Sequence, residues 1–134
     1  MKRLKPWKFL MNAASIALLI LMGAAAAQPF TSVFQGIRIR ASHAYVLEIQ
    51  RMNGNDWQTM ELRAGDVVQI AFETEKGGLR LQICAPDGTV IYRGNGRKTS
   101  SFTLNIAQTG AYTMEVKAKQ ARGNIRITIK ERNQ

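Results

Sequence analysis

Residues 79–94, LRLQICAPDGTVIYRG, hold side chains that could do chemistry, because Cys84 and Asp87 lie close together there. A cysteine nucleophile needs a lowered pKa, which arises in an electropositive, partly exposed setting. Arg80 and Arg93 are near enough in sequence to supply such charge. A reactive thiol, or a thiol that pairs with a second chain, is therefore one interpretation of this stretch.

The same stretch is also typical of two strands joined by a turn. Apolar and polar residues alternate over residues 79–85, which is the period of a half-buried strand. Pro86 presets the backbone for a turn at Asp87 and Gly88. Cys84 falls on the face opposite the Leu/Ile row, where a free cysteine can pack as a small hydrophobe. We therefore interpret Asp87 as a turn residue and Cys84 as a buried, unreactive thiol.

Other catalytic groupings are sparse. His43 is the only histidine, so a nucleophile with its base would have to join His43 to Cys84 and an acid in one cleft. Glu73 and Glu75 are close in sequence, but glycoside hydrolysis needs two carboxyl groups across a substrate cleft. We predict that the protein is not an enzyme, and a small enzyme built on His43 and Cys84 is the alternative.

No cofactor or metal site is predicted. Calcium takes about six to eight oxygen ligands, commonly with several carboxylates. Asp56 with Asn53 and Asn55 would form at most a weak site of this kind. No glycine-rich loop has the strand–helix context that phosphate binding needs.

The first 27 residues read as a targeting segment. Four basic residues precede an apolar run, and four alanines follow it, which are the three parts of a secretory signal. An uncleaved membrane anchor is the alternative, because the apolar stretch is near the length of about 20 residues that spans a bilayer. In both cases we expect an exported protein, secreted or associated with the cell envelope, that meets the membrane only through this segment.

The rest of the chain, residues 28–134, is expected to form one domain. It carries 15 of the 19 Lys and Arg residues and all nine acids, hence a formal charge of +6. One cysteine cannot form an internal disulfide, so the domain depends on its hydrophobic core. Short alternating segments separated by glycine-containing turns predict an all-β, antiparallel sandwich of about eight strands with jelly-roll-like topology. The expected turns are MNGND, RAGD, EKGG, APDG, RGNGRK, QTGA and ARGN.

A family resemblance rests on these turns and core positions. The chain resembles the bacterial pre-peptidase C-terminal (PPC) domain and, more loosely, the Golgi-dynamics (GOLD) sandwich over about residues 36–130. The shared pattern comprises an "aGD" turn, an L-x-L-x-I strand, a "pdG" turn, a phenylalanine strand and a "tGaYtmeV" strand. Its residues are Leu62, Ala64, Gly65, Asp66, Leu79, Leu81, Ile83, Pro86, Asp87, Gly88, Phe102, Gly110, Tyr112 and Val116. The resemblance implies a small, non-catalytic sandwich. The chain lacks the clustered acids of the calcium-binding members.

The basic surplus suggests a binding surface. Basic residues alternate with apolar ones in three expected strands, and on neighbouring strands they would share one polar face. Such a face could hold an anionic envelope polymer or glycan. It could equally be a solvated face that prevents aggregation. The candidate residues are Arg38, Arg40, Lys117, Lys119, Arg126 and Lys130.

Trp57 is the remaining candidate, since we expect it in or beside the NGND loop. It could cap the core or stack on a sugar, and capping is the expectation because large aromatic side chains usually bury most of their surface. Nucleic acid is not expected as a partner, because aromatic residues do not interleave with the basic ones. A structural accessory domain that packs against a partner protein is the alternative to glycan binding.

Overall fold

Six strands, all paired antiparallel, make up the part of the chain that the computed structural model describes, residues 31–98 and 100–132. The sheet order is β1-β2-β6-β3-β4, with β5 paired to β3. The predicted all-β, antiparallel sandwich is thereby confirmed. The strands are β1 (Val33–Ala41), β2 (Ala44–Leu62), β3 (Val67–Cys84), β4 (Val90–Gly94), β5 (Ser100–Asn105) and β6 (Gly110–Glu131).

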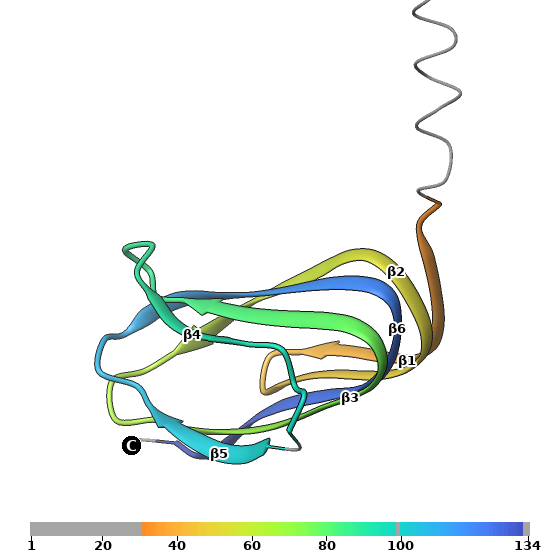
Figure 1. The fold of residues 1–134 in the computed structure, drawn as a ribbon. Helices are drawn as coiled ribbons and strands as arrows, with labels where there is room; N and C mark the ends of the chain where they lie inside the picture. The colour runs from red at the N-terminus through yellow and green to blue at the C-terminus, as the bar shows by residue number, and fades with distance from the viewer. Residues whose placement is uncertain (1–30, 99, 133–134) are drawn as a thin grey trace, which may run out of the picture. The chain divides into compact units, whose positions relative to one another are not determined.

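Three strands are long enough to cross from one layer of the sandwich to the other. β2, β3 and β6 have 19, 18 and 22 residues, well beyond the roughly 3–10 residues of most strands. Each curves over at the same end of the domain (Figure 1). Before the bend, residues 67–72 of β3 pair with β5, whereas after it residues 81–84 pair with β4. The two halves of each strand therefore belong to different layers.

We name the layers by their edge strands. The β1 layer contains β1, β5 and residues 44–49, 67–74 and 123–131. The β4 layer contains β4 and residues 54–62, 78–84 and 110–118.

The strand count is lower than predicted, because three expected turns are bends inside continuous strands. MNGND, EKGG and ARGN mark the places where β2, β3 and β6 cross between layers. The pairing register shifts at two of them, between Ile49 and Gly54 and between Thr74 and Gly78. Glycine and bulges let a strand turn sharply without losing its neighbours. Six predicted strands thus merge into three.

Gly77 permits a close approach of two strands at the bend. Its φ is 68°, in the region that favours glycine, and a Cβ added there would lie 2.0 Å from the carbonyl oxygen of Gln120. Gln120 itself has a φ of 47°. β3 and β6 therefore approach each other closely at the bend only because residue 77 has no side chain.

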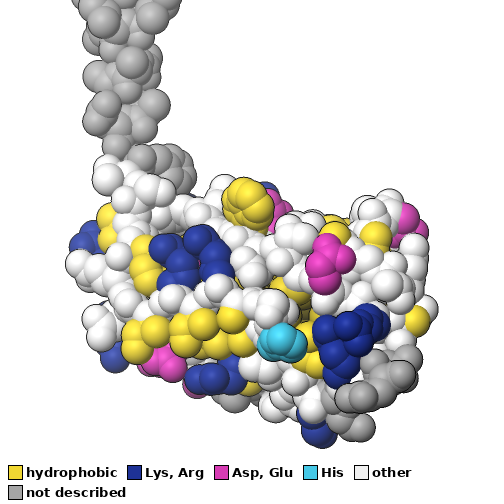
Figure 2. Space-filling model, turned by 180° about the vertical axis from the view of Figure 1, so that it is seen from behind, with side chains coloured by type: hydrophobic (Ala, Val, Ile, Leu, Met, Phe, Trp, Pro, Cys, Tyr) yellow, Lys and Arg dark blue, Asp and Glu magenta, His cyan; other side chains and the backbone are white. Residues whose placement is uncertain are grey.

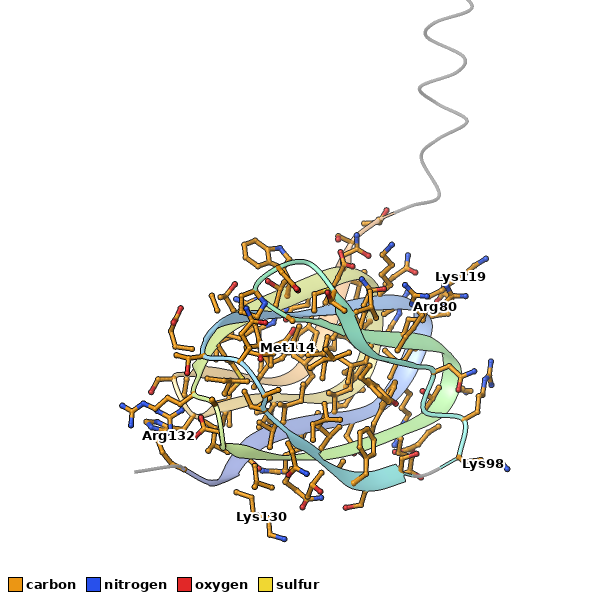
Figure 3. All side chains as sticks on the ribbon, turned by 90° about the vertical axis from the view of Figure 1, so that its left-hand side faces the viewer. Arg80, Lys98, Met114, Lys119, Lys130 and Arg132 are labelled. Atoms are coloured by element: carbon orange, nitrogen blue, oxygen red, sulfur yellow. The ribbon has the colours of Figure 1, made fainter. Side chains whose placement is uncertain are left out.

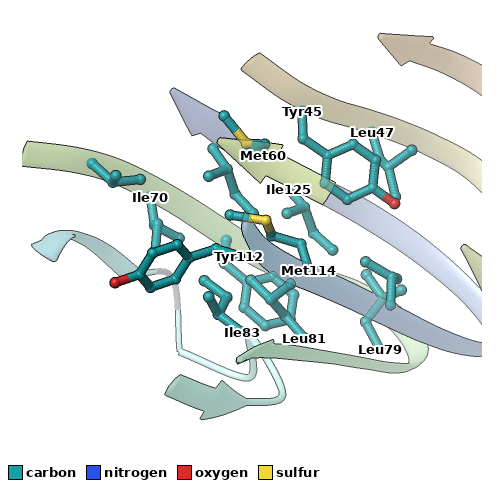
Figure 4. Close-up of a cluster of buried hydrophobic side chains, with 14 of the residues drawn as sticks. Tyr45, Leu47, Met60, Ile70, Leu79, Leu81, Ile83, Tyr112, Met114 and Ile125 are labelled. Atoms are coloured by element: carbon teal, nitrogen blue, oxygen red, sulfur yellow. The ribbon is translucent and has the colours of Figure 1, made fainter. Parts of the chain in front are cut away.

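The core lies between the two layers and follows the predicted alternation. The residues expected to point inward on β3, among them Ile70, Phe72 and Leu81, are at most 2% exposed. Figure 4 shows side chains of β2, β3 and β6 meeting from both layers. Burying each such side chain contributes about 1.5–3 kcal/mol relative to leaving it in water. The core therefore holds the layers together without disulfides.

The APDG turn is confirmed. The Gly88 amide donates to the carbonyl of Ala85 at 2.9 Å, and β3 and β4 pair on either side as a hairpin. The Thr89 amide donates to the carboxylate of Asp87 at 3.0 Å, and this hydrogen bonding lowers the pKa of Asp87. Asp87 is therefore used locally as a turn residue.

The predicted leader, residues 1–27, lies outside the described residues. Within residues 31–98 and 100–132, no helix is long and apolar enough to span a bilayer.

Candidate ligand-binding face

The six basic candidates do not share a face. Residues paired directly across two strands point to the same side of the sheet. Arg38 is paired with Leu47 and Arg40 with Tyr45, and both of these partners are fully buried. Arg38 and Arg40 therefore point toward the gap between the layers and not to an outer face.

The other four divide between the two layers. Lys117 lies opposite Arg80, and Lys119 lies opposite Gly78, in or beside the β4 layer. Arg126 lies opposite Val46 in the β1 layer, where Lys130 is also exposed. Figure 3 places Lys119 and Lys130 on different sides of the domain. The expected common face is wrong, because β6 bends between its two groups of cations.

Arg38 and Arg40 close the open edge of the sandwich through one buried acid. Asp56 on β2 is 4% exposed. Its carboxylate accepts hydrogen bonds from Arg40 and from the Tyr45 hydroxyl, and Arg38 Nε lies 3.3 Å from its Oδ1. The guanidinium of Arg38 also stacks 4.1 Å from the ring centroid of Phe34. This cluster joins β1 to the opposite layer.

The residues of the weak calcium site considered from sequence do not converge on one point. The carboxylate of Asp56 is engaged by Tyr45 and the two arginines. Asn55 precedes it in a regular strand, so the two side chains point to opposite faces. In the described part of the chain, no cluster of three or more His, Cys, Asp or Glu residues could hold a metal ion.

Tyr45 should make the free energy of unfolding fall at alkaline pH. Burial, then the hydrogen bond to Asp56, raises the pKa of Tyr45 above its usual value. An unfolded tyrosine ionises near pH 10, so above that pH the folded state binds more protons than the unfolded state. We expect the free energy of unfolding to be unaffected by Tyr45 below about pH 10 and to fall by up to about 1.4 kcal/mol per pH unit above it.

Urea titrations between neutral and alkaline pH test this expectation, with Tyr45→Phe as the comparison. The variant should lose part of the alkaline slope, because it has no phenol to ionise. An identical slope in both proteins would contradict the assignment.

Trp57 differs from its expected setting. It lies within β2, not in a loop, and is 63% exposed, so it does not cap the core. Its register partner is Glu115, which is paired in turn with Gln82, and Gln82 with Arg93. These four residues form one row across the outer face of the β4 layer.

A second row runs beside the first. Asn55 lies opposite Lys117, and Lys117 lies opposite Arg80. We call the two rows together the Trp57 face: Asn55, Trp57, Arg80, Gln82, Arg93, Glu115 and Lys117. The face carries an exposed indole at one side and three cations with one acid across the rest.

The Trp57 face is hollowed around its polar residues. A depression of about 270 Å³ is lined by Arg80, Gln82, Arg93, Glu115 and Lys117. Arg93 donates two hydrogen bonds to the side-chain oxygen of Gln82, at 3.0 and 2.9 Å. This contact holds the guanidinium of Arg93 against the sheet.

Like charges face each other directly on this surface. Arg80 and Lys117 are cross-strand partners, and within residues 31–98 and 100–132 neither forms an ion pair. A second like-charge pair, Lys76 and Arg122, lies at the bend. There a carboxylate oxygen of Glu75 lies 3.5 Å from Nε of Arg122 and partly balances the positive charge. Directly opposed like charges destabilise a sheet. A bound anion would relieve that repulsion.

The residues required by the enzyme alternative lie apart. His43 is in the turn between β1 and β2, with Nδ1 2.8 Å from the Ser42 hydroxyl. Cys84 ends β3 in the other layer and is half-buried, more exposed than expected, with its sulfur 3.5 Å from the Gln82 amide. Their positions do not define one cleft.

Sequence reasoning missed five members of the Trp57 face as binding residues. Asn55 enters the sequence analysis only as a possible calcium ligand, and Arg80 and Arg93 only as charges near Cys84. Gln82 and Glu115 are not among its candidates. Their alternation with apolar residues marked them as outward-facing, but only the strand order brings them beside Trp57.

Comparisons with known proteins give only distant likenesses. No family model and no curated protein matches the sequence, so membership of the PPC family is not established. Three solved structures are similar. The first is PliG of Aeromonas hydrophila, a periplasmic inhibitor of g-type lysozyme. The second is the C-terminal CBM6 of the marine laminarinase LamC from Zobellia galactanivorans, and the third is TmCBM61 in complex with β-1,4-galactotriose.

The numerical likeness is low in each case. Sequence identities are 15%, 20% and 16%, and TM-scores are 0.49, 0.37 and 0.37, in the same order. The matches cover 71%, 69% and 77% of this chain and 94%, 98% and 74% of the others. At this level of similarity the comparisons assign no ligand to this chain.

Proposed function

We propose that the protein is an exported, non-catalytic binding module that holds an anionic glycan or a related anionic polymer of the cell envelope on the Trp57 face. The observation that carries this proposal is the exposed indole of Trp57 in register with a row of polar and basic side chains. The leader-like residues 1–27 support export.

The two parts of the face have complementary tasks. An exposed indole offers a flat apolar surface with a negative π face, against which the C–H face of a sugar ring can pack. The cations Arg80, Arg93 and Lys117 supply charge for carboxylate, sulfate or phosphate groups on the same polymer. Because the strands are regular, the side chains point outward in fixed rows and suit an extended ligand.

The charge arrangement favours an anionic ligand over a neutral one. Without a ligand, the pair Arg80 and Lys117 costs stability. An anion placed between them replaces repulsion with two attractions, which salt would screen. Binding should therefore weaken as ionic strength rises.

Substitution of Trp57 and Lys117 tests the proposal with heparin as the anionic polysaccharide probe and neutral dextran as its control. Trp57→Ala and Lys117→Gln should each weaken heparin binding by about tenfold, a loss of about 1.4 kcal/mol. Lys117→Gln should also raise the free energy of unfolding by about 0.2–1 kcal/mol, because it removes a like-charge pair. Affinity is measured by calorimetry across a salt series, and stability by urea titration.

Lys130→Gln is the matched control, because it removes the same charge from the other layer. Its heparin affinity should stay close to that of the unmodified protein. If Lys130→Gln weakens binding as much as Lys117→Gln, heparin responds only to net charge and the proposed site is wrong. Unchanged binding by Trp57→Ala would remove the sugar-stacking role. Retention on isolated cell envelopes, measured with the same variants, tests the envelope assignment.

A further inference from the structure

We propose that the free edge of β1 binds an extended segment of a partner protein in which apolar and acidic residues alternate. This surface is separate from the Trp57 face, and the inference goes beyond the proposed function. It rests on the position of β1 in the sheet and on the two different faces that β1 presents.

β1 is an end strand of the sheet. Among the described residues it pairs on one side only, with β2, over all nine of its residues. The other edge of such a strand presents unpaired backbone N–H and C=O groups, which can pair with an added strand. The backbone of β1 therefore offers a place for a further strand.

The outer face of β1 is apolar. Ile37 and Ile39 are 53% and 45% exposed, among the most exposed large hydrophobic side chains of the described residues. Val46, the partner of Ile39 on β2, lies on the same face and is 3% exposed. Figure 2, which views the domain from behind Figure 1, shows hydrophobic side chains in a row beside a cluster of basic side chains. An added strand would cover the two isoleucines.

The inner face of β1 carries surplus positive charge. Arg38 and Arg40 share the single carboxylate of Asp56, and their side chains remain 33% and 44% exposed. One acid against two guanidinium groups leaves a net charge of about +1 at this edge. An acidic side chain on an added strand would neutralise it.

These two faces define the sequence of the partner segment. Side chains directly opposite each other on paired strands interact, and opposite charges or two apolar groups are favourable. Residues opposite Ile37 and Ile39 should be apolar, and those opposite Arg38 and Arg40 should be Asp or Glu. The pattern has a period of two, as any strand requires.

A second copy of the chain does not fit the same edge. A register that aligns the isoleucines of two copies also sets arginine opposite arginine, and a slip of one residue sets isoleucine opposite arginine. Inward-pointing charges on edge strands commonly prevent such self-pairing. Arg38 and Arg40 thus exclude a second β1 and select an acidic strand.

Synthetic nine-residue peptides test this inference directly. The probes are a peptide that alternates Val and Glu, a peptide that alternates Val and Lys, and the Val/Glu peptide with N-methyl groups on alternate amides. The Val/Glu peptide should bind the full-length protein and shift the amide signals of residues 33–41 in NMR spectra. The Lys and N-methyl peptides should bind at least about tenfold more weakly, because they lose the charge match or the backbone pairing.

Matched double variants locate the site. Ile37→Lys with Ile39→Lys should weaken binding of the Val/Glu peptide at least about tenfold, because the apolar face is lost. Val90→Lys with Ile91→Lys alters two exposed hydrophobic residues of β4, at the other end of the sheet order, and should leave binding unchanged. Trp57→Ala should also leave it unchanged, which separates this outcome from the heparin experiment.

Several results would overturn the inference. Equal affinity of the Val/Lys and Val/Glu peptides would remove the charge argument, and insensitivity to N-methylation would remove backbone pairing. A dimer in sedimentation experiments that dissociates on substitution of Ile37 and Ile39 would show that a second copy occupies the edge.

Discussion

Replacing Asp56 with alanine should lower the free energy of unfolding by about 2–3 kcal/mol, since it leaves the buried Tyr45 hydroxyl without its acceptor and two partly exposed guanidinium groups without their counter-charge. Asp56 is 4% exposed and contacts Arg38, Arg40 and Tyr45. Without its carboxylate, the two guanidinium groups repel each other and the buried Tyr45 hydroxyl loses its acceptor. For about 100 folded residues the thermal midpoint should fall by roughly 8 °C or more.

Urea and thermal unfolding measure this loss, with Glu48→Gln as the matched control. Glu48 pairs with Arg126 at 3.4 Å, but both side chains are at least half exposed. Breaking such an exposed pair should cost at most about 1 kcal/mol. If Asp56→Ala does not fold, Asp56→Asn is the milder variant, since asparagine keeps the shape and one acceptor oxygen but loses the charge and the second acceptor. Similar losses for Asp56→Asn and Glu48→Gln would contradict the assigned role of Asp56.

Gly77→Ala should lower the free energy of unfolding by about 3 kcal/mol, from positive-φ strain and steric overlap together. The added Cβ would lie 2.0 Å from the carbonyl oxygen and 2.5 Å from the carbonyl carbon of Gln120. Both of these are backbone atoms, so β3 and β6 must separate at the bend. The strain therefore falls where both strands cross between layers.

Gly88→Ala separates the two causes. Gly88 has a φ of 90°, but an added Cβ there meets no atom within 4 Å. It should cost only the backbone strain, about 1–2 kcal/mol. Equal losses at the two positions, measured by urea titration, would show that the bend tolerates a side chain and that its close approach is not essential.

The bends also explain which parts of the binding surface were predictable. Alternation identified the inward residues of each strand, because period-two burial is a local property of the chain. Alternation predicts Ile70, Phe72 and Leu81 in the core, and they are buried. The APDG turn was recognised for a similar reason, since Pro86 and Gly88 set the backbone locally.

The grouping of the basic residues was not predictable in this way. Alternation shows that Lys117 and Arg126 point away from the apolar row of β6, but not that the strand bends between them at Gln120. Alternation also does not distinguish Arg38, whose cross-strand partner is the buried Leu47, from a cation that faces solvent. A glycine-containing break reads as a turn whether the chain reverses there or crosses to another layer.

The sequence by itself thus determined the all-β class, the core positions and the APDG turn, because these depend on residues close together in the chain. The tertiary structure alone decided that Trp57 faces outward beside Arg93 and Lys117, that Asp56 holds two arginines, and that β1 is an end strand among the described residues. Each of these facts depends on which strands are neighbours. That choice minimises the free energy of the whole core, and no single segment encodes it.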